Sequence, residues 1–113
     1  MINTRLTKDA GIRYPIICGA MYPCSNPELV SAASEGGGIA ILQPVSLTMV
    51  HGFDKPNRKE GLRAGIRHIR TLTDKPIGFN ALIEKGSEKY IQQMSEWIDI
   101  ALEEGVLFYV TSL

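Results

Sequence analysis

The chain has 113 residues, of which 44% are hydrophobic and 21% are charged, and its 12 basic and 12 acidic residues cancel. This composition is ordinary for a globular protein, and the balanced charge predicts neither a nucleic-acid partner nor a membrane-surface partner. The polar start, MINTRLTKDAG, has no apolar segment of the signal-peptide kind, and no apolar run approaches the ~20 residues that span a bilayer. We therefore expect a cytoplasmic protein.

Four short apolar runs predict strands. They are rich in β-branched or aromatic residues and show little alternation of apolar and polar positions, which is typical of strands covered on both faces in a parallel sheet. The runs are Ile16–Met21, Ile39–Gln43, Pro76–Leu82 and Val106–Leu113.

Helical patterns lie between these runs. Asn26 followed by Pro27 suits a helix start, and the glycine triplet at 36–38 suits its end. The predicted helices cover about Pro27–Glu35, Asn57–Leu72 and Ser87–Glu104. The spacing predicts that the second helix buries Leu62, Ile66 and Ile69, and that the third buries Tyr90, Met94, Trp97, Ile98, Ala101 and Leu102.

The resulting order of strands and helices predicts an α/β fold with a parallel sheet and right-handed crossovers, in one domain over residues 1–113. Half of the basic residues lie in 57–75 and half of the acidic residues in 84–104. These two segments belong to consecutive helices, so their outer faces either attract each other or form two separate solvated surfaces. The sequence leaves both alternatives open.

Small and amide side chains stand where the predicted strands end, which is where parallel α/β folds bind ligands. Gly19 and Ala20 remove bulk, so a flat ligand can lie against the backbone, and Met21 can wall one side. Gln43 and Asn80 offer amides, which suit a heterocycle with both donors and acceptors on its edge. The alternatives are that the small residues only permit close packing and that Gln43 caps a turn. An amide at Asn80, in so apolar a strand, needs partners.

Other chemistry-bearing residues give weaker signals. His51 follows the second strand on the ligand side, as a substrate contact or as a solvated loop side chain, whereas His68, flanked by arginines, is expected on the surface. Cys18 and Cys24 are the two cysteines of the chain, and we expect both to be reduced thiols. No metal-ligand spacing, nucleophile elbow or phosphate loop is present in the sequence, so we predict neither a metal site nor a catalytic residue.

Two stretches resemble the nitronate monooxygenase family, whose members are FMN-dependent (β/α)8 barrels. GIRYPIICGAMYPCSNPELVSAASEGGGIAIL resembles the family's opening, and TDKPIGFNALI resembles its third strand. The resemblance implies that Gly19, Ala20 and Met21 lie against the flavin. It also implies that Gln43 and Asn80 reach the edge of the isoalloxazine ring.

The same likeness implies that Tyr22 and His51 border the space for a small-molecule substrate. Cys18 stands where many members carry Gln, and this departure leaves the subgroup open. By resemblance the activity is oxidation of alkyl nitronates with O2. A flavin-dependent enoyl-acyl-carrier-protein reductase, or a catalytically inactive module that associates with itself, are the alternatives.

A complete barrel takes eight βα units and about 250 residues, whereas this sequence predicts three units and a fourth strand. We therefore expect the N-terminal half of a TIM barrel. The family's phosphate-binding loops and catalytic histidine fall outside these residues, so the isolated chain is not expected to bind FMN by itself. Its first and fourth strands form open edges, which predict self-association.

Overall fold

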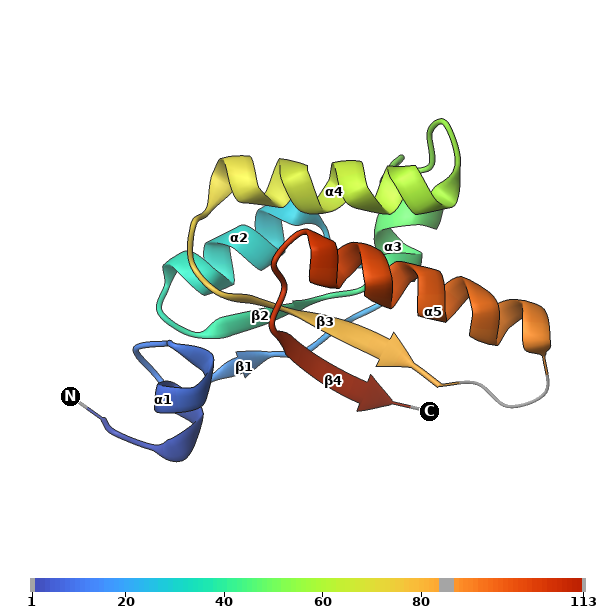
Figure 1. The fold of residues 1–113 in the computed structure, drawn as a ribbon. Coiled ribbons are helices and arrows are strands. Elements are labelled where there is room, and N and C mark those ends of the chain that lie inside the picture. The colour runs from blue at the N-terminus through green and yellow to red at the C-terminus, as the bar shows by residue number, and fades with distance from the viewer. Residues whose placement is uncertain (1, 84–86, 113) are drawn as a thin grey trace.

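The computed structural model describes residues 2–83 and 87–112. The predicted alternation of strands and helices is confirmed, and two short helices, α1 and α3, are added to it (Figure 1). The elements in chain order are α1 (Arg5–Ala10), β1 (Ile17–Cys18), α2 (Pro27–Glu35), β2 (Ile39–Leu42), α3 (Pro44–Met49), α4 (Arg58–Leu72), β3 (Ile77–Leu82), α5 (Glu88–Glu103) and β4 (Phe108–Ser112).

The four strands form one parallel sheet in the order β1-β2-β3-β4. Figure 1 shows α2, α4 and α5 on the same side of this sheet. Sequential parallel strands joined by crossover helices on one side are the arrangement of a (β/α)8 barrel. The predicted fold class, half of a TIM barrel, is therefore confirmed. None of the helices in the described ranges is long and apolar enough to cross a membrane.

The core lies between the sheet and the three long helices. Leu62, Ile66 and Ile69 of α4 are fully buried, as predicted. On α5 the buried residues are Met94, Trp97, Ile100 and Ala101, whereas Tyr90 and Ile98 are only partly buried. The prediction for Leu102 was wrong, because its side chain is 51% exposed. Ile100 takes the inward position instead, since two residues turn a helix by more than half a circle.

The face of the sheet opposite the helices is closed only at its centre. A Cβ on Gly78 would come within 2.5 Å of Ile41 Cδ1 and 3.1 Å of Phe108 Cδ1, so these side chains fold over the glycine from both neighbouring strands. The prediction that strands are buried on both faces therefore holds for β2 and β3. It was wrong for the edge strands, where Ile17 is 45% exposed and β4 is only partly buried.

Several predicted bounds differ from the observed ones by one or more residues, and two helices were not predicted. β1 covers Ile17–Cys18 and not Ile16–Met21, because the chain turns away into hydrogen bonds between Met21 and Ser25. α3 was missed because its six residues are too few to show a helical period. α1 was missed because it carries no apolar stripe. Its start is marked only by a capping box between two threonines, Thr4 and Thr7. The predicted last strand residue, Leu113, lies outside the described residues.

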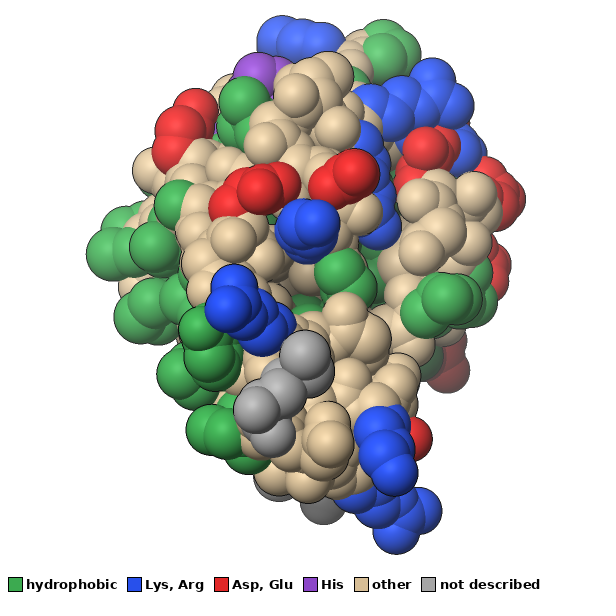
Figure 2. Space-filling model, turned by 90° about the vertical axis from the view of Figure 1, so that its left-hand side faces the viewer, with side chains coloured by type: hydrophobic (Ala, Val, Ile, Leu, Met, Phe, Trp, Pro, Cys, Tyr) green, Lys and Arg blue, Asp and Glu red, His purple; other side chains and the backbone are tan. Residues whose placement is uncertain are grey.

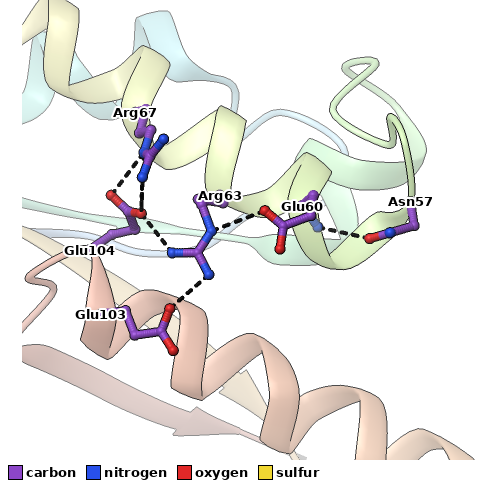
Figure 3. Close-up of polar contacts among 6 residues, drawn as sticks. All are labelled: Asn57, Glu60, Arg63, Arg67, Glu103 and Glu104. Carbon is purple, nitrogen blue, oxygen red and sulfur yellow. Dashed lines mark hydrogen bonds and ion pairs between the residues drawn. The ribbon is translucent and has the colours of Figure 1, made fainter.

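Helices α4 and α5 are joined by charge pairs, so the attractive alternative is confirmed (Figure 3). Arg63 donates to Glu104 at 2.8 Å and to Glu103 at 2.7 Å, and Arg67 pairs with Glu104 at 3.1 Å. Burial alone would raise the pKa of Glu104, but hydrogen bonds from Arg67 and Arg63 outweigh it and hold this pKa below its ordinary value. Hydrogen bonds to Glu104 and Glu103 raise the pKa of Arg63.

Candidate functional site

The candidate site is the edge of the sheet at which the strands end, on the side that the arrows of Figure 1 point to. Leu42 pairs with Phe79 across β2 and β3, so Gln43, which directly follows β2, comes next to Asn80 of β3. Asn80 pairs in turn with Val110 of β4. The predicted amides therefore lie side by side, as expected from strand ends of a parallel sheet.

Gly19, directly after β1, faces open space. A Cβ built on it meets nothing within 4 Å, and its backbone is not in the left-handed region. Neither packing against this chain nor backbone conformation explains the glycine, which speaks against the close-packing alternative. Ala20 is half-buried and Met21 is exposed at the same edge. The missing side chain at 19 leaves room that a flat group can occupy.

The two amides are buried, and each uses its oxygen within the chain. Gln43 is 8% exposed and its Oε1 accepts from Val45 N at 3.4 Å, so the capping alternative is confirmed in the form of a helix N-cap. Asn80 is 6% exposed and its Oδ1 accepts from the Ser112 hydroxyl at 3.0 Å. Within residues 2–83 and 87–112, neither amide nitrogen donates a hydrogen bond. Both nitrogens can therefore donate to a ligand.

The predicted substrate-side residues lie in two neighbouring loops. His51 Nε2 lies 2.7 Å from the carbonyl oxygen of Pro23, which joins the loop after α3 to the loop after β1. Tyr22, next to Pro23, has an exposed side chain. Sequence reasoning missed Ser25, a buried serine whose hydroxyl accepts from Met21 N at 2.7 Å. Its only sequence signal was its place just before the helix cap Asn26.

The remaining singled-out residues lie away from this edge or take part in packing. Cys18 packs against the core cluster, Cys24 is exposed, and both are free thiols. His68 is exposed on α4 with its ring 5.7 Å from that of Phe53, which confirms the surface prediction. Over the part of the chain that the structure describes, no group of three His, Cys, Asp or Glu side chains is placed to hold a metal ion.

The two largest hollows among those described lie elsewhere. One, of about 530 Å³, is at the opposite end of the strands and is lined by residues that include Arg70, Pro76 and Leu107. Figure 2 looks onto that end, where charged side chains surround the hollowed surface. The other, of about 500 Å³, lies between the starts of α4 and α5 and is lined by residues that include Arg58 and Glu96. The candidate site is thus an open rim and not an enclosed cavity.

A family model described as nitronate monooxygenase matches residues 3–112. The chain belongs to the nitronate monooxygenase family. The resemblance drawn from the sequence is thereby confirmed, and this family is one of flavin-dependent oxidoreductases. Nitronate monooxygenase of Pseudomonas aeruginosa is 30% identical over 98 residues, covering 87% of this chain and 25% of that protein.

Two further relatives widen the comparison beyond that enzyme. A protein of Rhodococcus jostii named (3aS,4S,5R,7aS)-5-hydroxy-7a-methyl-1-oxo-octahydro-1H-indene-4-carboxyl-CoA dehydrogenase is 30% identical over 79 residues, covering 70% of this chain and 20% of its own length. FabK of Thermotoga maritima superposes with a TM-score of 0.73 at 28% identity, over 98% of this chain and 30% of that one. The chain therefore spans 20 to 25% of the curated relatives' length and 30% of this solved chain.

The nitroalkane oxidase of Streptomyces ansochromogenes shares the fold at 21% identity, with a TM-score of 0.67 over 96% of this chain and 35% of that one. At this identity the likeness concerns the fold alone. It adds a second solved structure that matches nearly the whole half-barrel described above.

Proposed function

We propose that this chain supplies half of the flavin-binding rim in a cytoplasmic, FMN-dependent enzyme that oxidises alkyl nitronates with O2. The observation that carries the proposal is the open space over Gly19, at the same edge as two buried amides with unused donors. FMN, when bound, supplies the electron transfer, while the protein binds and orients it.

The side chains at this edge fit an isoalloxazine ring. Gly19 and Ala20 leave the backbone accessible to a flat face, and Met21 can wall it. The amide nitrogens of Gln43 and Asn80 can donate to the ring's carbonyl oxygens and acceptor nitrogens. Membership of the nitronate monooxygenase family supports the cofactor, and the similarity to an enzyme named nitronate monooxygenase supports the substrate.

The test uses the whole gene product that carries these residues, because the chain spans only 20 to 25% of the length of these curated relatives. We expect it to be yellow and to release FMN on denaturation. An alkyl nitronate added without oxygen is expected to bleach the flavin, and readmitted oxygen to restore its colour. A colourless gene product whose spectrum does not change on FMN titration would contradict the proposal.

A second candidate keeps the flavin and changes the substrate to an enoyl thioester. The name of the Rhodococcus jostii relative favours it, because that protein's substrate is a carboxyl-CoA compound. The two candidates separate in one experiment. NADH or NADPH consumption that depends on an enoyl thioester, without bleaching by nitronate, would favour the reductase.

The isolated chain of residues 1–113 is further proposed to associate with itself through its open sheet edges. Among the residues that the structure describes, β1 and β4 each pair on one side only; Ile17 of β1 is 45% exposed, and Leu107, just before β4, is 87% exposed. Unpaired strand edges flanked by apolar side chains favour pairing with another chain. Light scattering is expected to show species heavier than the 12.4 kDa monomer, and a single 12.4 kDa species would contradict this.

A further inference from the structure

Two loops that the rim depends on are tied together by a single side chain. The loop after β1 carries Met21 and Tyr22, and the loop after α3 carries His51. The contact between His51 Nε2 and the Pro23 carbonyl, at 2.7 Å, joins residues 28 positions apart. Because a carbonyl oxygen only accepts, Nε2 must carry a hydrogen. Both the neutral Nε2–H tautomer and the imidazolium can make this bond, so the tie does not depend on the charge of the ring.

The other end of the same loop is fixed from the side of α2. Ser25 is 1% exposed, its hydroxyl accepts from Met21 N at 2.7 Å, and its own N donates to Met21 O at 2.8 Å. The segment from Met21 to Ser25 is therefore a closed turn with one buried anchor. Pro23 lies midway along it, and its carbonyl is bound by His51. Three hydrogen bonds thus fix the backbone that carries the exposed side chains of Met21 and Tyr22: two between Ser25 and Met21, and one between His51 and Pro23.

The geometry assigns His51 the role of a positioning residue for the Met21–Ser25 turn, in place of direct contact with substrate through Nε2. The effect of this role on substrate binding rests on the proposed function, in which the turn holds Met21 and Tyr22 over the rim next to Gly19. Without the bond, the turn keeps its Ser25 anchor but loses its tie to the loop after α3. Substrate binding then weakens, while the chemistry on bound flavin is retained.

The test compares His51→Ala and His51→Gln in the gene product, with Met49→Ala, an exposed residue two positions away, as the control. Hydrogen exchange is followed by mass spectrometry on peptides that cover residues 19–26. In His51→Ala we expect exchange there to rise about tenfold and KM for the nitronate to rise about tenfold with kcat nearly unchanged, as suits one lost hydrogen bond. His51→Gln is expected to restore both, because its amide can donate to the Pro23 carbonyl.

Exchange in His51→Ala that equals the wild type would overturn the inference, and so would a fall in kcat without any change in exchange. The exchange measurement needs neither flavin nor substrate. A gene product without flavin would therefore overturn the proposed function and still leave the role of His51 to be decided by exchange.

Discussion

Gly19→Val is expected to weaken FMN binding by the gene product while leaving its fold intact. A Cβ at this position meets nothing within 4 Å, so valine is accommodated by the chain itself. The same volume is the space proposed for the flat face of the flavin. Overfilling a close contact costs about 1–3 kcal/mol, so we expect the dissociation constant of FMN to rise about 10- to 100-fold. Fluorescence titration of the apoprotein with FMN measures it.

Gly19→Ala is the graded control, since one methyl group fills less of the space and is expected to have a smaller effect. Thermal unfolding of both variants without flavin is expected to match the wild type within about 0.5 kcal/mol, the usual range for surface changes. Unchanged FMN affinity in the valine variant would remove Gly19 from the flavin site. A large loss of stability would mean that the space over Gly19 is filled by the protein.

Gly61→Ala is expected to cause a larger loss of stability than either Gly19→Val or Gly65→Ala. A Cβ on Gly61 would lie only 2.2 Å from the carbonyl oxygen of Phe53 and 2.6 Å from Asp54 Cα. Both are backbone atoms, so no side chain can rotate aside. Alanine alone would stabilise a helix interior by about 1 kcal/mol relative to glycine. We nevertheless expect a net loss of about 3 kcal/mol, because α4 must separate from the preceding segment. Urea unfolding measures the change.

Gly65→Ala in the same helix is the matched control. Its Cβ would meet the Phe53 ring at 3.2 Å and Leu47 Cδ1 at 3.4 Å, and both are side-chain atoms that can shift by a few tenths of an ångström. Here the gain in helix propensity and the cost of crowding nearly cancel, so we expect a change below about 1 kcal/mol. A Gly61→Ala variant as stable as the wild type would show that the segment before α4 moves freely away from the helix.

Local signals in the sequence predicted one element, α2, to the residue. α2 begins at Pro27 and ends at Glu35 as expected, because Asn26 caps its start and glycines follow its end. α3 has the same kind of start, with Gln43 as N-cap and Pro44 at the first position, but its six residues are too few to show a helical period. β1 was predicted too long because an apolar composition cannot reveal where a strand leaves the sheet.

The candidate site was predictable only as far as the topology dictates it. Parallel strands in sequential order bring their ends together, so the adjacency of Gln43 and Asn80 followed from the strand assignment. The bond between His51 and Pro23 did not, because it joins two loops 28 residues apart with no shared period or register. The open space over Gly19 could not be predicted either, because the sequence alone does not distinguish a glycine that is needed for close packing from one that faces open space.

The ion pair between Arg63 of α4 and Glu104 at the end of α5 keeps its charges when the pH falls below neutral. With the pKa of Glu104 held below its ordinary value of 4.5, this carboxylate stays ionised throughout the mildly acidic and neutral range. Arg63, whose pKa is raised, stays cationic over the same range. The Arg63–Glu104 pair therefore keeps both of its charges across the interval in which histidines gain and lose protons. This ion pair therefore holds α4 against α5 to the same extent at mildly acidic and at neutral pH. A response of the protein to pH in this interval has to come from other groups.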